Sequence, residues 1–202
     1  MDTDIGSIVQ TVVSTTNTND DIVALNLVQA GNGSWNRVGK KIKCQSVRVT
    51  GTIALSTQAV ASTSPDFCRM TLVWDKQPSS ATIPIFSDIF GRTDQLGAET
   101  TQVYDPLRYD NVGRFKVLLD KKYNFNPGYE RAAAGNTMVL SVDEFVNLKN
   151  RETIFSGQSN PMTIADISTG ALYIIFRTGD NANNSVITVN NNFVARLRYT
   201  DI

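Results

Sequence analysis

Long segments of this chain alternate apolar and polar side chains with a period of two residues, which is typical of strands with one buried face. The clearest segment is Lys41–Leu55, and Asp66–Asp75, Phe115–Phe125 and Val186–Ile202 follow the same rule. Valine, isoleucine and threonine, which pack well on pleated sheets, together number 55 against 12 leucines. The sequence therefore predicts a protein that is mostly β.

Within Lys41–Leu55 the alternation changes phase. Ile42 and Cys44 lie in one phase, whereas Val47 and Val49 lie in the other. An extra residue in one strand of a pair produces such a change, so a β-bulge or bend is predicted near Gln45–Ser46. By contrast, Ala171–Thr178 is apolar on both faces, as expected of a strand buried between two layers.

The connections between strands decide among the all-β folds. Thr137–Val142 and Glu144–Phe155 are weaker strand candidates, and Ile83–Phe90 predicts a short helix or turn within a long connection. With these, roughly eight strands are separated by long, uneven loops without crossover helices, which excludes a parallel sheet and disfavours an up-and-down barrel. We expect one domain, an eight-stranded antiparallel jelly-roll sandwich with one or two short helices. It would cover residues 35–202, with residues 1–34 as an N-terminal arm or added edge strand.

Several classes of function are disfavoured by composition. The chain has no histidine, which excludes Ser-His-Asp and Cys-His catalysis and His-ligated metals, and its carboxylates are too scattered to predict a catalytic pair. Cys44 and Cys68 are expected to be buried thiols. Asn19–Asp21 and Gly179–Asn184 could offer oxygens to calcium, but such clusters are more typical of turns. We therefore expect no enzyme, cofactor or metal, and no membrane span or signal peptide.

Charge is balanced overall but unevenly distributed. Lysine plus arginine and aspartate plus glutamate both number 19, so a generally basic surface is excluded. Between Asp21 and Asp66, however, there is no acidic residue, while five cations occur: Arg37, Lys40, Lys41, Lys43 and Arg48. These cations could bind phosphates while Trp35 stacks on an unpaired base. The alternative is an ordinary solvated strand, on which lysines prevent aggregation.

Several segments resemble a known family in their order and spacing. WNRVGKKIK at Trp35–Lys43, with the following Ser46–Thr52, resembles the first long strand of single-jelly-roll capsid proteins of circovirus- and geminivirus-like viruses with circular single-stranded DNA. Later segments agree in order: Met70–Pro78, Ser87–Phe90, Arg114–Lys122, Gly170–Ile175 and Arg196–Asp201. Coat proteins of plant satellite viruses with RNA genomes are similar in strand plan.

The resemblance implies a structural role. Copies would assemble into a small icosahedral virion (T=1, about 60 copies of one subunit in a closed symmetric shell) around a single-stranded genome. In the family, the first long strand and the last strand pair in the sheet nearer the interior, which would place the five cations at the inner surface. Subunit contacts would come from the loops Gln77–Gly113 and Asn126–Gly135, and the candidate contact residues are Trp35, Tyr104, Tyr109 and Tyr129. The implied partners are identical subunits, viral nucleic acid and an unidentified host receptor, with assembly in the host nucleus or cytoplasm.

One departure from the family bears on genome binding. The family's long basic arm is absent, since Met1–Asp21 contains acidic residues but no lysine or arginine. Either such an arm has been removed, or the shell neutralises its genome by other means, so we expect weak, salt-sensitive nucleic-acid binding. The alternative functions are a satellite-virus capsid that packages single-stranded RNA and a carbohydrate-binding jelly-roll module.

Overall fold

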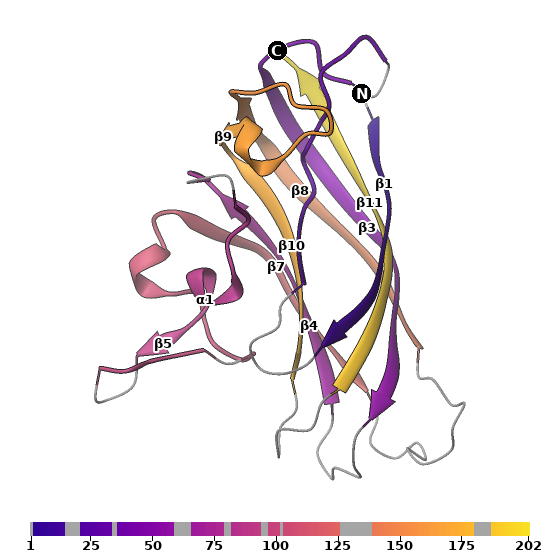
Figure 1. Ribbon diagram of the computed structural model, residues 1–202, viewed down its shortest axis with the longest axis vertical. Coiled ribbons are helices and arrows are strands. Elements are labelled where there is room, and N and C mark those ends of the chain that lie inside the picture. Colours follow the sequence, from indigo (N-terminus) through magenta and orange to yellow (C-terminus); the bar gives the residue numbers. More distant parts are fainter. Residues whose placement is uncertain are drawn as a thin grey trace.

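The computed structural model describes residues 2–14, 21–33, 36–58, 66–78, 82–93, 97–101, 103–125, 139–179 and 187–202. It is built almost entirely of antiparallel strands in two packed sheets (Figure 1). The elements in chain order are β1 (Asp2–Ser14), β2 (Asp21–Ala24), β3 (Lys41–Gln58), β4 (Asp66–Asp75), α1 (Phe86–Ile89), β5 (Arg92–Thr93), β6 (Glu99–Thr100), η1 (Tyr109–Asn111), β7 (Phe115–Phe125), β8 (Val139–Phe155), η2 (Ile164–Asp166), β9 (Ile167–Thr169), β10 (Ala171–Gly179) and β11 (Ile187–Asp201).

The strand order is that of a jelly roll. One sheet has the order β1-β11-β3-β8-β9, and the other has the order β2-β10-β4-β7. Among the eight principal strands, the first pairs with the eighth, the second with the seventh, the third with the sixth and the fourth with the fifth. This nested pairing confirms the predicted jelly-roll sandwich.

The position of β3 in this order differs from the expectation. β3 does pair with the last strand, β11, as the family resemblance implied, but it is the third principal strand and not the first. β1 and β2 precede it and form edges of the two sheets, so residues 2–14 and 21–24 belong to the strand plan of the sandwich. Their short or weakly patterned sequences gave no clear strand signal.

Most strand boundaries agree with the sequence pattern. β4 and β7 cover the predicted segments, and β11 differs from Val186–Ile202 by one residue at each end. The two weak candidates between Thr137 and Phe155 form one strand, β8, in which Lys149 and Asn150 have positive φ angles of 54° and 56°. The predicted helix is the single turn α1.

The predicted bulge is present in β3. Tyr199 of β11 pairs with Cys44, and the preceding Arg198 pairs with Ser46, so Gln45 is the extra residue. The β3–β8 register also shifts here, but the surplus residues are in β8: Cys44 pairs with Arg151 and Ser46 with Asn147, so three residues of β8 lie against Gln45. On either side of the bulge the apolar side chains of β3 point into the sandwich, where Ile42, Cys44, Val47 and Val49 are fully buried.

The core lies between the two sheets. Phe176 of β10 and Phe193 of β11 meet there with ring centroids 5.1 Å apart. Cys44 and Cys68 are both buried free thiols, as expected, and burial raises the pKa of Cys44 to about 11. Residues 171–178 of β10 are buried on both faces, which confirms the two-layer prediction for that strand.

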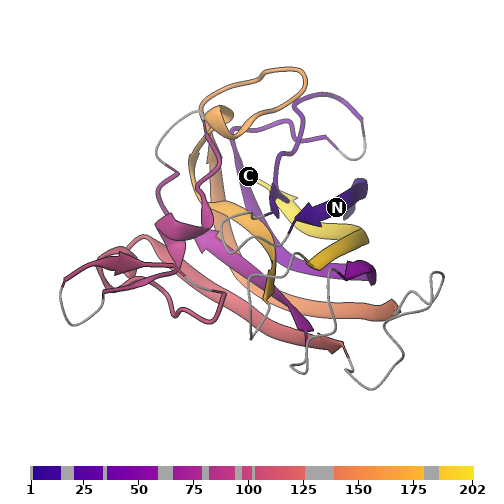
Figure 2. The same cartoon turned by 60° about the horizontal axis from the view of Figure 1, so that its bottom comes forward.

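The long connection between β4 and β7 covers the outer face of the four-stranded sheet over β10 and β4, and it projects from the sandwich in Figures 1 and 2. Arg177 of β10 lies 3.9 Å from the ring centroid of Phe86 in α1. Arg69 of β4 packs over Phe90 and donates hydrogen bonds to the carbonyls of Val103 and Asp105. The sheet that contains β3 has no such cover in the described part of the chain, so its outer side chains reach solvent.

None of the helices among the described residues is long and apolar enough to cross a membrane.

The close approach of β3 to β11 gives a test of the fold. A Cβ at Gly51 would lie 2.0 Å from the carbonyl oxygen of Asn192 and 2.5 Å from Cα of Phe193. We expect Gly51→Ala to lower the free energy of unfolding by about 2–3 kcal/mol, because both neighbours are backbone atoms that must shift. Gly113→Ala is the matched control, since nothing lies within 4 Å of its Cβ position. Equal urea midpoints for the two variants would contradict the observed β3–β11 packing.

Candidate nucleic-acid interface

The outer face of the sheet β1-β11-β3-β8-β9, called the open face below, carries the cations of the adjacent strands β3 and β11. The side chains of β3 and β11 alternate between the core and this face, and the outward positions are mainly polar or charged. The cations on the open face are Lys41, Lys43 and Arg48 of β3, and Arg196 and Arg198 of β11.

Strand register places three of the outward side chains in one row. Arg196 of β11 is directly opposite Arg48 of β3, and Arg48 is directly opposite Phe145 of β8. Phe145 is 64% exposed, which is unusual for a phenyl ring on a sheet. The open face thus combines guanidinium groups with one exposed aromatic ring at neighbouring positions.

Arg48 also pairs with a carboxylate on this face. Its Nε and Nη2 donate hydrogen bonds of 2.9 Å each to the two carboxylate oxygens of Asp143. These bonds lower the pKa of Asp143 and raise the pKa of Arg48. Because both side chains are more than half exposed, solvent screens the ion pair, and a phosphate could replace the carboxylate.

Arg37, which the charge pattern grouped with the exposed cations, is fully buried. Its guanidinium donates to the carbonyls of Val28, Gly39 and Gly157 at 3.1, 2.7 and 2.8 Å, and it lies 4.0 Å from the ring centroid of Phe155. Burial lowers its pKa. The structure gives Arg37 the role of joining three chain segments, so it does not contribute to the open face.

The other predicted site residues are dispersed. Lys40 is exposed in the turn before β3, next to the open-face lysines. Tyr104 is 45% exposed and packs on Phe67, with ring centroids 4.7 Å apart. Tyr109, at the start of η1, is 95% exposed. Trp35 and Tyr129 lie outside the described residues.

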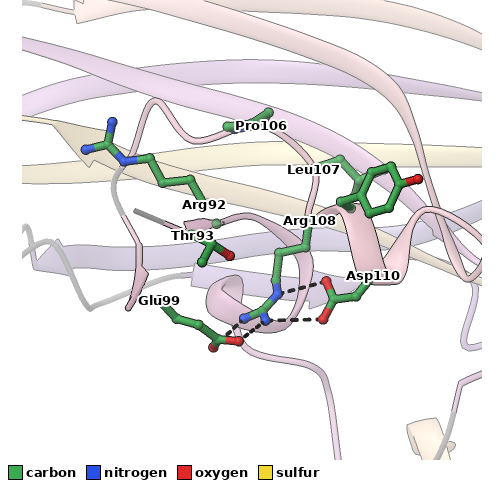
Figure 3. Close-up of a pocket in the computed structure, with 9 residues that line it drawn as sticks. Arg92, Thr93, Glu99, Pro106, Leu107, Arg108 and Asp110 are labelled. Atoms are coloured by element: carbon green, nitrogen blue, oxygen red, sulfur yellow. Dashed lines mark hydrogen bonds and ion pairs between the residues drawn. The ribbon is translucent and has the colours of Figure 1, made fainter. Parts of the chain in front are cut away.

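A second site candidate is a hollow of about 410 Å³ in the β4–β7 connection, lined by residues 91–93, 99 and 106–110. Figure 3 shows Arg108 between two carboxylates: it donates to Glu99 at 2.6 and 3.0 Å and to Asp110 at 3.2 Å. These bonds lower the pKa of both Glu99 and Asp110. Because two carboxylates already neutralise Arg108, this hollow is poorly suited to phosphate.

Among the described residues, no group of three or more cysteine, aspartate or glutamate side chains has the geometry of a metal site. Arg196, Arg198 and Phe145 are not among the residues that the sequence predicts to be functional. The arginines could have been found from their alternation with buried Ala195, Leu197 and Tyr199, combined with the predicted pairing of the first and last long strands. Nothing in the local sequence distinguishes Phe145, because a phenylalanine in a strand is usually buried.

The family model described as Geminivirus coat protein/nuclear export factor BR1 family matches residues 9–201 of the chain. No curated protein matches it.

The buried guanidinium of Arg37 gives a test of its structural role. We expect Arg37→Met to lower the free energy of unfolding by about 3 kcal/mol, since three carbonyls lose a charged donor and part of the network stays buried. Lys40→Met, which removes the same charge at an exposed position, is expected to leave the thermal unfolding midpoint nearly unchanged. Comparable midpoints for both variants would show that Arg37 is dispensable.

Proposed function

The chain belongs to the Geminivirus coat protein/nuclear export factor BR1 family, and on that premise we propose that its copies assemble into a closed shell around single-stranded DNA. As a viral coat protein it is a component of the virion. We propose an icosahedral T=1 shell of about 60 identical copies. Assembly would take place in the host nucleus or cytoplasm, and a host receptor would contact the exterior.

The main support for genome binding is that the outer faces of the two sheets differ in solvent exposure and in their cations. In the four-stranded sheet, β10 and β4 are covered by the β4–β7 connection, and only the edge strand β7 exposes lysines. The open face presents Lys41, Lys43, Arg48, Arg196 and Arg198 on two adjacent strands. Phosphates can exchange with the carboxylates that stand beside clustered cations, here Asp143 at Arg48 and, by register, Asp4 opposite Arg196, even when the whole chain has no net charge. We therefore propose that the open face lines the interior of the shell and contacts the genome, with Lys40 at its margin.

We propose that copies of the chain contact one another through the β4–β7 connection. Its described residues include several large exposed apolar side chains, namely Ile83, Ile85, Tyr104, Tyr109 and Val112. Aromatic side chains contribute strongly to interfaces at low entropic cost, and Tyr109 is the most exposed of the set. Trp35 and Tyr129 remain candidate contact residues because aromatic side chains in loops can bury much area at low entropic cost.

Two alternative functions, a carbohydrate-binding module and an RNA-packaging shell, can be distinguished from a DNA-packaging shell. A carbohydrate-binding module requires a strip of aromatic rings on a sheet face, but Phe145 is the only large aromatic side chain pointing outward from the described part of the open face. An RNA-packaging shell would have the same cationic face. Digestion of the packaged nucleic acid with DNase and with RNase distinguishes the two genome types.

The salt dependence of binding tests the role of the open face. We expect the triple variant Lys41→Gln, Lys43→Gln, Arg198→Gln to reduce the slope of log K against log salt for single-stranded DNA by about 2, since each cation that neutralises one phosphate contributes about 0.7. Fluorescence anisotropy with a labelled oligonucleotide between low and moderate salt measures this slope.

The matched control removes three cations from other surfaces. Lys76→Gln, Lys116→Gln, Lys122→Gln changes the net charge equally but leaves the open face intact. We expect its slope to equal that of the unmodified protein. If both triple variants reduce the slope equally, the binding follows total charge, and the open face is not the genome-binding surface.

Particle formation tests the proposed contacts between copies. We expect Tyr109→Ser combined with Ile85→Ser to reduce the yield of particles, because both side chains are exposed in the isolated chain and would be buried between copies. Light scattering and negative-stain microscopy of the unmodified protein should show particles of roughly 10–25 nm, as expected of a small closed shell. An unchanged particle yield, with the same unfolding midpoint, would remove the β4–β7 connection from the proposed interface.

A further inference from the structure

We propose that Phe145, Arg48 and Arg196 form a nucleotide subsite on the open face. An unpaired base would stack on the ring of Phe145, and the adjacent backbone phosphate would lie between the two guanidinium groups. This inference rests on the proposed function, because it specifies how a single strand would meet the open face.

The exposed position of the Phe145 ring would allow an unpaired base to stack on it. The ring points away from the core and is 64% exposed, whereas Val142, three residues earlier on the opposite face of β8, is buried. The outward neighbours of Phe145 on β8 are Asp143 and Asn147, which are polar and exposed, so no apolar cluster surrounds the ring on its own strand. Every base has a π-face, and aromatic rings on open sheets bind single strands by stacking with little sequence preference.

The phosphate position follows from the register of β3 and β11. Arg48 and Arg196 are directly opposite each other; Arg48 pairs with Asp143, and the register places Asp4 of β1 opposite Arg196. A phosphate between the two guanidinium groups would therefore compete with these carboxylates. Together with Thr50 and Val194, the two arginines line a shallow depression of about 190 Å³. The next strand carries Phe145 opposite Arg48, and adjacent strands lie about 4.8 Å apart, which brings the ring within one nucleotide of the depression.

The carboxylate of Asp143 would compete with a phosphate for the guanidinium of Arg48. This carboxylate accepts two hydrogen bonds from Arg48, the geometry that a phosphate would adopt with the same guanidinium. The strand would therefore displace Asp143 from Arg48 on binding. Removing this carboxylate should raise affinity, which is opposite to the effect expected from removing an ordinary ion-pair partner that only stabilises the fold.

The subsite requires unpaired bases. In a duplex the bases are stacked on one another and their faces are not available to Phe145, so a double strand can use only the cations. The ring should accordingly contribute to the binding of oligothymidylate and contribute nothing to an abasic oligonucleotide of the same length and charge.

The test compares these two probes by fluorescence anisotropy at fixed salt. We expect Phe145→Ala to weaken oligothymidylate binding about 5- to 150-fold, the range measured for loss of one stacked base, and to leave the abasic probe unaffected. Phe145→Trp should restore the preference for oligothymidylate. We expect Asp143→Asn to strengthen the binding of both probes several-fold, because it frees Arg48 and removes a negative charge.

Three results would overturn the subsite: equal binding of both probes by the unmodified protein, equal loss of both in Phe145→Ala, or weaker binding in Asp143→Asn. Loss of particles in Phe145→Ala with unchanged oligothymidylate binding would identify the ring as a subunit contact and also overturn it. These outcomes differ from failure of the proposed function, in which the triple variant at Lys41, Lys43 and Arg198 would bind the abasic probe as well as the unmodified protein does.

Discussion

The antiparallel register between β3 and β11 determines which side chains of this protein reach solvent. Because side chains alternate strictly along a strand, a slip of one residue in β11 would turn Arg196 and Arg198 toward the core and expose Leu197 and Tyr199. Burial of charged groups without partners is so unfavourable that only one register is available. Gly51 permits the close approach of the two strands, since its neighbours across the pair are backbone atoms. The cationic composition of the open face is thus a consequence of packing in the core.

The bulge at Gln45 adds a second constraint. Lys41 and Lys43 have odd positions, whereas Arg48 has an even one, so a regular strand would place them on opposite faces of the sheet. The extra residue reverses the phase between Cys44 and Ser46, and all three cations point outward while the apolar residues on both sides of the bulge remain buried. One inserted residue therefore joins two groups of charges on a single surface.

Much of the fold could be predicted from the sequence because strand patterning is local. The boundaries of β4 and β7, the bulge and the buried thiols follow from alternation along single segments. The site could be predicted only in part, because its members meet through pairing between distant segments. Arg37 illustrates the difference: its neighbours in sequence are cations, but carbonyls from Val28, Gly39 and Gly157 surround it in space. Likewise, the relation of Phe145 to Arg48 depends on the β3–β8 register, and a charge count along the chain cannot show it.

Zero net charge and genome binding are compatible when the two sheets differ in exposure. In the covered sheet, arginines such as Arg69 and Arg114 are paired with Asp120 and Asp75, so their charges are neutralised locally. On the open face, Arg48 is also paired with Asp143, and the register places Asp4 opposite Arg196, Asp2 opposite Arg198 and Glu152 opposite Lys43. One subunit therefore supports only weak binding. In the proposed shell, however, many copies present this face to one continuous strand, and after the first contact each further contact is intramolecular. The same coupling acts in the other direction, since a strand that binds several copies at once raises their local concentration and favours their assembly.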